Sequence, residues 1–313
     1  MATRLARRVW LGGAGATGVA AAAGMAYKAA PSVWRQFSRE FKRPVAHPPA
    51  TPDWRRWSDR GIHAAWLGHS TVLLRVDGFN ILTDPILSEW CGIHVGPFTV
   101  GLKRLTAPAL TAGNLPHIDL LLLSHAHMDH LDIPSVRALE NRGTAVVTAR
   151  STSDLLRTGR YASVREIGWG ESARVGPVSV KGVEVRHWGA RVRTDTYRGY
   201  NAYLIEAGRR RILFGGDTAI TDSFSSVRAS RPVDLAIMPI GAYDPWIHAH
   251  CNPEQAWRMG SDAGAEHFLP VHHQTFRLSR EPVGEPIERF LNAAGPHPDR
   301  VVTRHIGDEA RLG

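Results

Sequence analysis

The chain has 313 residues, enough for one large domain or two small ones. Hydrophobic residues make up 43% of the sequence and charged residues 21%, which excludes a chain that is disordered throughout. The formal net charge is +9, but much of the basic excess precedes residue 61, and no segment interleaves aromatic and basic residues in the way that nucleic-acid-binding proteins do. A non-enzymatic nucleic-acid-binding protein is therefore the lowest-ranked of the functions considered, and nucleic acid is not an expected partner.

The first 27 residues are typical of a signal or membrane anchor. Arg4, Arg7 and Arg8 precede Val9–Tyr27, a stretch without any charged residue, and Arg7-Arg8-Val9-Trp10-Leu11 resembles a twin-arginine signal. The stretch has about the length that spans a bilayer, although alanine and glycine favour insertion only weakly. We expect a membrane-associated protein at a bacterial-type inner membrane or in the periplasm, with the cytoplasm as the alternative. The sequence does not determine whether the N-terminal segment is cleaved.

Residues 28–60 are predicted to form a basic, proline-rich linker, with a catalytic domain over residues 61–313. Cys91 and Cys251 are isolated and lack the spacing of a thiolate zinc site, so two free thiols are the simplest expectation.

Short apolar runs bounded by turn residues predict the strands of this domain. They are Ile62–Leu67, Thr71–Val76, Asn80–Thr83, Ile118–Leu123, Ala145–Thr148, Val178–Arg186, Asn201–Glu206, Arg211–Phe214, Asp234–Pro239 and His267–Val271. Helical stretches are expected at Ile133–Glu140, Ser153–Thr158, Ala219–Arg228, Pro253–Gly264 and Pro286–Ala294. Two β-rich halves, divided near residue 175, predict two sheets with helices outside.

A histidine-rich run follows a strand that should be buried on both faces, Ile118–Leu123. It reads His125-Ala126-His127-Met128-Asp129-His130. Imidazole and carboxylate groups suit zinc. Alternating His125 and His127 can face one ion, and the adjacent pair Asp129 and His130 can face a second. Three further candidates also follow strand-like runs: His187, Asp217 and His272.

The sequence resembles the metallo-β-lactamase superfamily over about residues 66–276. The resemblance is carried by Trp66-Leu67-Gly68-His69-Ser70-Thr71, Leu82-Thr83-Asp84-Pro85, Ser124–Asp132, His187-Trp188, Gly215-Gly216-Asp217-Thr218 and Val271-His272. Within the superfamily it is most similar to the group of phospholipases D that hydrolyse N-acyl-phosphatidylethanolamine. That likeness is carried by Gly78–Pro85, Lys103-Arg104-Leu105-Thr106 and Met238-Pro239-Ile240-Gly241-Ala242-Tyr243.

The resemblance implies an α/β fold, an αββα sandwich of two mixed sheets flanked by helices, and a role for each site residue. His125, His127 and His187 would hold the first zinc ion; Asp129, His130 and His272 would hold the second; Asp217 would bridge both. Asp84 would orient a ligand, and His250 would lie near the leaving group of the substrate. The adjacent His273 leaves the last ligand open, although alignment favours His272.

A zinc-dependent hydrolase is therefore the expected function. Two zinc ions would lower the pKa of a bridging water toward about 7, for attack on a phosphodiester of an N-acyl-phosphatidylethanolamine-like phospholipid. His250 would protonate the leaving group or hold a phosphate oxygen. The alternative is a soluble-type zinc hydrolase of a lactone or small phosphoester.

The remaining expectations concern the pocket, the metal and the partners. Trp188, Tyr243 and Trp246 would line an apolar pocket, with core packing as the competing interpretation. Iron or manganese could replace zinc in an imidazole and carboxylate site. A membrane surface is the expected partner of the N-terminus, and a homodimer is compatible with the sequence. True β-lactamases commonly carry Cys where Asp217 stands, so antibiotic hydrolysis is not expected.

Overall fold

The computed structural model describes residues 40–95, 98–229 and 231–313. The expected N-terminal segment, residues 1–27, lies outside these ranges, as do residues 28–39 of the expected linker. Within them, no helix has the length and apolar character needed to cross a membrane. The chain divides into Met1–Pro44 and a compact unit, Val45–Gly313. In the first unit the structure describes helical residues 40–42, with an ion pair between Arg43 and Glu40 at 2.8 Å.

The compact unit begins earlier than the expected boundary at Gly61. Residues 45–60, which the sequence places in a linker, pack against the rest of the unit. Trp57 is buried and donates from Nε1 to Glu309 Oε2 at 2.9 Å. Trp54 begins a short 3₁₀ helix, Trp54–Arg56, and donates from Nε1 to the carbonyl of Asn114 at 2.8 Å.

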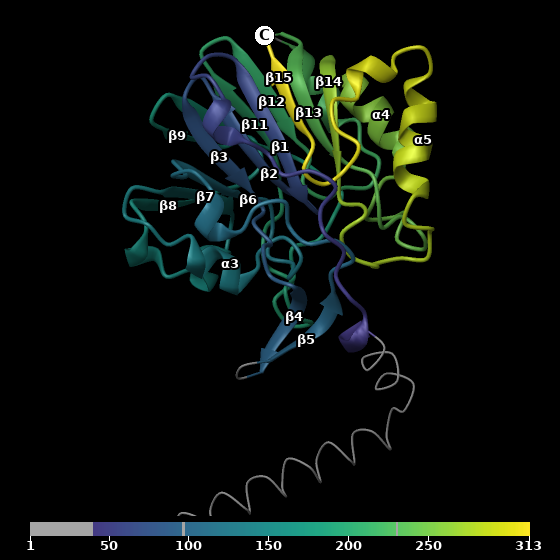
Figure 1. Ribbon diagram of the computed structural model, residues 1–313. Coiled ribbons are helices and arrows are strands. Elements are labelled where there is room, and N and C mark those ends of the chain that lie inside the picture. The colour runs from purple at the N-terminus through teal and green to yellow at the C-terminus, as the bar shows by residue number, and fades with distance from the viewer. Residues whose placement is uncertain (1–39, 96–97, 230) are drawn as a thin grey trace, which may run out of the picture. The chain divides into compact units, whose positions relative to one another are not determined.

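Two mixed β-sheets form the centre of this unit (Figure 1). The first has seven strands, in the order β15 (Glu309–Leu312), β1 (Ile62–Gly68), β2 (Thr71–Val76), β3 (Phe79–Thr83), β6 (Leu120–Leu123), β7 (Ala145–Ala149) and β8 (Ser163–Ile167). The second has six, in the order β14 (Ala265–Val271), β13 (Val233–Pro239), β12 (Arg210–Phe214), β11 (Ala202–Ala207), β10 (Val178–Val183) and β9 (Ser172–Val175). The expected division near residue 175 is confirmed, except that β15 returns to the first sheet.

Side-chain alternation along the second sheet explains how it is buried on both faces. Tyr203 and Ile205 of β11 join one apolar cluster with the strands of the first sheet. Ala202 and Leu204 join another, which includes residues of the helices α4 (Pro253–Asp262) and α5 (Glu285–Ala294). Because successive side chains of a strand point to opposite faces, one set fills the space between the sheets and the other lies under the helices. The expected αββα sandwich follows from this arrangement.

The expected helix start at Asn252 is confirmed. The Asn252 side chain accepts from the backbone N–H of Gln255, Gln255 reciprocates, and Pro253 occupies the first turn. The helix α3 (Ile133–Ala138) also begins with a side-chain cap. Its N-cap residue is Asp132, whose carboxylate accepts from Ser135 N at 3.1 Å.

Several elements differ from the expectations. The stretches expected as helices at Ser153–Thr158 and Ala219–Arg228 contain 3₁₀ helices, Ser153–Leu155, Thr158–Arg160 and Ser223–Ala229. These segments are short and rich in serine and threonine, whose side chains compete for backbone hydrogen bonds and favour turns. The strands β8, β9 and β15 and a hairpin of β4 (Trp90–Val95) with β5 (Phe98–Lys103) were not predicted from the sequence.

Candidate metal centre

Loops that follow strand ends bring the candidate ligands together. His125, His127, Asp129 and His130 follow β6, Asp217 follows β12, and His272 follows β14. The two sheets are joined here by backbone hydrogen bonds, from Asn201 N to the Ser124 carbonyl at 3.0 Å and from His272 N to the His69 carbonyl at 3.1 Å. The edge at which these strands end is therefore a shared rim between the sheets, as expected.

One group of donors comprises His125, His127, His187 and Asp217, whose potential ligand atoms lie within 4.8 Å of one another. His127 Nδ1 lies 2.8 Å from His125 Nε2 and 3.2 Å from His187 Nε2. Asp217 Oδ2 lies 3.8 Å from His187 Nε2 and 4.0 Å from His125 Nε2. Three imidazole nitrogens and one carboxylate oxygen thus converge on one point, which is the donor set of a four-coordinate metal ion.

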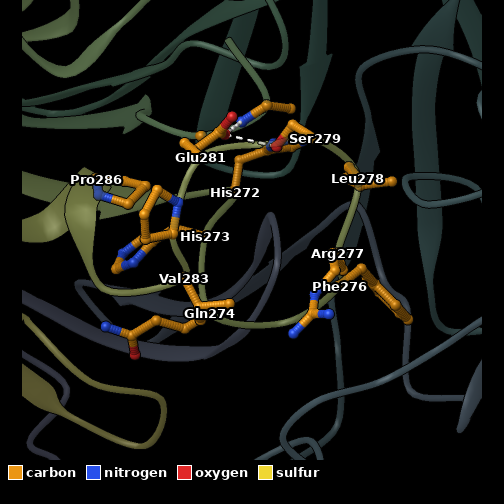
Figure 2. Close-up of a pocket in the computed structure, with 13 residues that line it drawn as sticks. His272, His273, Gln274, Phe276, Arg277, Leu278, Ser279, Glu281, Val283 and Pro286 are labelled. Carbon is orange, nitrogen blue, oxygen red and sulfur yellow. Dashed lines mark hydrogen bonds between the residues drawn. The ribbon is translucent and has the colours of Figure 1, made fainter. Parts of the chain in front are cut away.

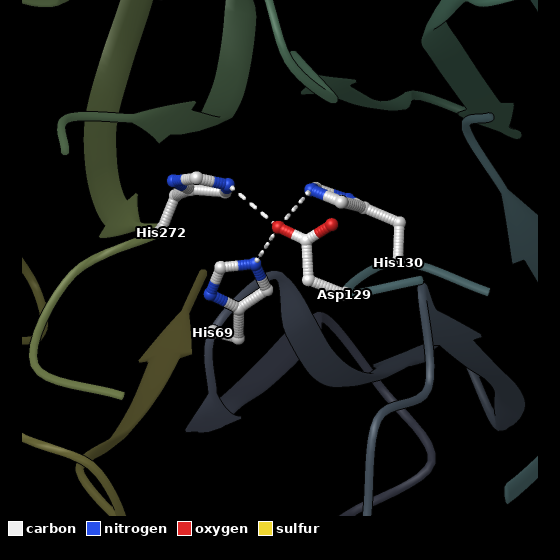
Figure 3. Close-up of side chains that lie close together, drawn as sticks. All are labelled: His69, Asp129, His130 and His272. Carbon is white, nitrogen blue, oxygen red and sulfur yellow. Dashed lines mark hydrogen bonds and ion pairs between the residues drawn. The ribbon is translucent and has the colours of Figure 1, made fainter. Parts of the chain in front are cut away.

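A second group comprises His69, Asp129, His130 and His272 (Figure 3). Asp129 Oδ2 lies 3.6 Å from His130 Nε2 and 3.5 Å from His272 Nε2. The same two nitrogens lie 3.0 Å and 3.2 Å from Asp217 Oδ2. Asp217 Oδ2 therefore lies between the two groups and could be a ligand in both.

The ionisation of His125, His187 and Asp217 suits a cation. Burial lowers the pKa of His125 and of His187 well below the ordinary value, so both rings are neutral and have a lone pair to donate. Burial raises the pKa of Asp217, but the facing His130 and His272 outweigh it and hold the carboxyl well below its ordinary pKa. A buried, ionised carboxylate surrounded by imidazoles is a strong ligand for a divalent metal.

Unpartnered polar atoms support the same fit. Among the described residues, both carboxylate oxygens of Asp217, Nε2 of His130 and Nε2 of His272 are buried and make no hydrogen bond. Buried polar atoms without a hydrogen bond are rare and costly in folded proteins. Each of these atoms points to a position that a metal ion would share, so the residues fit a pair of metal ions.

Hydrogen bonds on the far side of the ligand rings fix their orientation. Asp84 Oδ2 accepts from His130 Nδ1 at 2.7 Å and from Ser124 Oγ at 2.5 Å, and Ser124 Oγ lies 2.8 Å from His125 Nδ1. His187 Nδ1 donates to the carbonyl of Ala249 at 3.0 Å. A single buried carboxylate, Asp84, thus supports a ligand in each of the two groups, directly through His130 and through Ser124 for His125.

The structure separates His272 from its neighbour His273. The His272 ring lies in the cluster, whereas the His273 ring stacks on Trp66 with ring centroids 4.4 Å apart. Figure 2 shows His273 beside a small cavity of about 20 Å³ next to the cluster, which Gln274 and Glu281 also line. The geometry therefore favours His272 as the ligand.

A cavity of about 190 Å³ opens directly on the cluster. It is lined by His127, Asp129, Trp188, Asp217, Ala242, Trp246, His250 and Leu278. His250 Nδ1 lies 3.7 Å from Asp217 Oδ2, and burial lowers the pKa of His250 to about 4, which leaves the ring neutral near pH 7. Tyr243 does not line this cavity: it is buried, and its hydroxyl donates to Glu285 at 2.6 Å.

Comparison with protein families agrees with this geometry. Residues 79–273, more than half of the chain, match the beta-lactamase superfamily domain. The chain belongs to the metallo-β-lactamase superfamily. The metallo-beta-lactamase fold protein YhfI from Bacillus subtilis has a TM-score of 0.55 and 18% identity, over 80% of this chain and all of that one.

Two similar proteins indicate where the chain stands within the superfamily. An uncharacterized protein of Mycobacterium tuberculosis is 37% identical over 274 residues, which cover 84% of this chain and 73% of the relative. The N-acyl-phosphatidylethanolamine-hydrolyzing phospholipase D 1 of Caenorhabditis elegans is 30% identical over 238 residues, which cover 71% of this chain and 66% of the relative. Superfamily membership and the donor set together identify a metal-dependent hydrolase with a binuclear-type histidine and aspartate site.

His69 was not predicted as a site residue from the sequence, although it also follows a strand end directly. His69 Nε2 lies 2.9 Å from Asp129 Oδ2, and its ring centroid lies 4.1 Å from that of His272. This distance is that of a hydrogen bond, and an ionised carboxylate can only accept, so His69 Nε2 donates to Asp129 and orients that carboxylate.

Replacing His69 with phenylalanine should therefore weaken one metal position. The ring packing is kept while the donor to Asp129 is lost, and we expect the affinity for the second metal ion to fall by about 10–100-fold. Competition with a chromogenic chelator measures this affinity. His63→Phe is the matched control, because His63 is a buried histidine of the preceding strand, β1, that stacks on Trp57 outside both donor groups. Unchanged affinity in His69→Phe would show that His69 does not position Asp129.

Proposed function

We propose that the protein hydrolyses a phosphodiester bond of a phospholipid with a polar N-acyl head group, as a phospholipase D does. The observation that carries the proposal is the two-sided cavity at the donor groups. His127, Asp129, Asp217 and His250 line one part of it, whereas Trp188, Trp246 and Leu278 supply an apolar part. Such a cavity suits an amphiphilic substrate, and its volume of about 190 Å³ suits the phosphate and head group rather than a whole lipid.

Sequence similarity supports the same substrate class. The Caenorhabditis elegans relative is by name a phospholipase D that hydrolyses N-acyl-phosphatidylethanolamine. The cavity lining includes Trp188 and Trp246, two of the three aromatic residues expected there from the sequence. Both side chains are also partly exposed to solvent, so apolar groups are available where acyl chains would leave the cavity.

The residues of the site would have different roles in the reaction. His125, His127 and His187 would hold one metal ion, Asp129, His130 and His272 the other, and Asp217 both. The ions, which we take to be zinc, would when bound supply an acidified water as the nucleophile and stabilise negative charge on the phosphate. Asp84, Ser124 and His69 would orient the ligands, and the apolar side chains would exclude bulk water.

His250 is best placed to hold a phosphate oxygen. Its backbone N–H donates to the carbonyl of Trp246 at 2.9 Å, which fixes the loop, and its ring lines the cavity close to Asp217. A neutral imidazole can donate one hydrogen bond to a non-bridging oxygen as charge develops there.

Replacing His250 with alanine should then lower kcat/KM by about 100-fold or more. The loss should be similar for an N-acyl phospholipid and for bis(p-nitrophenyl) phosphate, because a phosphate oxygen is present in both. His250→Gln, which keeps an N–H donor, should recover part of the activity. A loss confined to the phospholipid, whose alkoxide leaving group needs a proton, would instead make His250 the proton donor.

A substrate screen tests the proposed function itself. The metal-loaded protein is assayed against N-acyl-phosphatidylethanolamine, bis(p-nitrophenyl) phosphate and a series of lactones. We expect turnover of the phospholipid, with release of the phosphatidic acid product. Activity on lactones alone would overturn the proposal in favour of a zinc-dependent lactone hydrolase.

A further inference from the structure

The hairpin of β4 and β5 is a two-stranded sheet, separate from the two large sheets. Its register pairs Cys91 with Leu102 and Ile93 with Val100. Because side chains alternate along a strand and cross-strand partners share a face, these four residues lie on one face of the hairpin. All four are apolar, so the face is continuous along the described part of the hairpin.

The root of this face is buried beside the cavity. Cys91 is 7% exposed and packs in a cluster with Ile86 and Phe276, against which Leu102, Met128 and Leu278 also lie. Leu278 in turn lines the cavity at the metal centre. The hairpin is therefore anchored to the wall of the substrate cavity.

The outer part of the same face is open to solvent. Ile93 is 57% exposed and Val100 is 52% exposed, and Figure 1 shows the hairpin projecting away from the two sheets. A two-stranded hairpin is only marginally stable in water on its own, and exposing an apolar pair to water is a further free-energy cost. Trp246 and Ile247, each 44% exposed, add apolar surface next to the cavity, which Trp246 also lines.

The compact unit begins beside the hairpin. Ala46 N donates to the Leu105 carbonyl at 2.9 Å, and Ala107 N donates to the Ala46 carbonyl at 2.8 Å. Leu105 lies two residues after β5, so Ala46, near the start of the compact unit, lies beside the root of the hairpin. The sequence before Ala46 carries the uncharged stretch Val9–Tyr27.

The charges along the sequence suit an anionic surface. Between the uncharged stretch and Val45 there are five basic residues, Lys28, Arg35, Arg39, Lys42 and Arg43, and one acidic residue, Glu40. No aspartate or glutamate occurs from Trp90 to Lys103. Basic residues near the surface of an anionic bilayer each contribute about 1 kcal/mol of binding.

We propose that the apolar face of the β4–β5 hairpin, through Ile93 and Val100, inserts into the interfacial layer of an anionic phospholipid bilayer. The insertion brings the opening of the cavity toward the lipid surface, because the root of the hairpin shares an apolar cluster with Leu278, which lines the cavity. Short apolar segments flanked by basic residues bind bilayers in this way. The proposal extends the proposed function but does not depend on which bond is cut.

Site-directed fluorescence on the full chain tests the insertion without any assay of activity. A Val100→Cys variant is labelled with nitrobenzoxadiazole, a dye that brightens and shifts to the blue in an apolar environment. The native Cys91 and Cys251 are buried and favour labelling at position 100, and the labelled wild type measures any background. Arg209→Cys is the matched control, because the neighbouring Arg210 contacts Gly313, at the end of the unit away from the hairpin (Figure 1).

Vesicles of phosphatidylglycerol and phosphatidylcholine should increase the emission at position 100 severalfold and leave position 209 unchanged. The Ile93→Ser/Val100→Ser double variant should bind these vesicles about tenfold more weakly in cosedimentation. An unchanged dye at position 100 in a chain that still cosediments would overturn the proposal, since the N-terminal segment alone would then hold the protein. A wild-type dimer that the double variant converts to monomers would also overturn it, by assigning the face to a second copy. Neither result would bear on the substrate screen.

Discussion

Replacing Asp217 with alanine is expected to abolish metal binding at both positions and to reduce hydrolysis by well over about 100-fold. Loss of a residue that merely orients a ligand costs about 10–100-fold, and Asp217 contacts both donor groups. Its carboxylate also faces five histidine rings, so without it the buried site loses one of the two carboxylates of the donor groups and part of its attraction for cations.

The Asp217→Ala protein should remain folded, which separates a defect in the site from a defect in the fold. Asp217 lies in a loop after β12, and neither of its carboxylate oxygens makes a hydrogen bond to the described residues. Metal content by mass spectrometry and secondary structure by circular dichroism measure the two effects. Asp222→Ala is the matched control, because the Asp222 carboxylate is exposed in the same loop region. Two bound ions in Asp217→Ala would exclude its role as the shared ligand.

Replacing Asp84 with alanine is expected to damage stability and metal binding together. Asp84 is fully buried, and its carboxylate accepts from the backbone and hydroxyl of Ser124 and from His130 Nδ1. Removing one partner of a buried charged network costs about 3–5 kcal/mol of unfolding free energy. The His130 ring also loses the contact that fixes its orientation, so we expect metal affinity to fall by about 10–100-fold.

Two further variants separate these contributions. Asp84→Asn preserves the shape and one acceptor, so it should unfold less readily than Asp84→Ala while still binding metal weakly. Asp119→Ala removes a carboxylate that accepts from Asn80 N at 2.8 Å just before β6, and it should lower stability without changing metal affinity. Denaturant unfolding and chelator competition give both quantities. Wild-type metal affinity in Asp84→Ala would contradict the role of Asp84.

Much of the fold could be predicted because the buried strands are continuous apolar runs in the sequence. The run at β6 has no polar side chain, and all four residues are buried in a strand that pairs in parallel with β3 and β7. The elements that sequence analysis missed lack this pattern. Strand β15 alternates charged and apolar residues at a sheet edge, and β4 and β5 contain glycines at positions 92 and 101 where the two strands approach closely.

The candidate site could be predicted because its residues obey one rule: a polar side chain follows the end of a buried strand. The rule leads to His125, Asp217 and His272, which the structure places in neighbouring donor groups. Applied to β1, the rule also leads to His69, which directly follows that strand. Proximity to site residues in the sequence does not by itself predict a place in the cavity. Tyr243 was expected to line it, but its hydroxyl donates to Glu285 and the residue does not line the cavity.

The number of metal ions that support activity tests the central claim most directly. The full chain is stripped with a chelator, titrated with zinc, and assayed at each step for bound metal by mass spectrometry and for hydrolysis of bis(p-nitrophenyl) phosphate. The two donor groups that share Asp217 predict that the stripped protein is inactive and that activity reaches its maximum at two ions per chain. Full activity at one ion per chain, or undiminished hydrolysis by the stripped protein, would contradict a binuclear hydrolase.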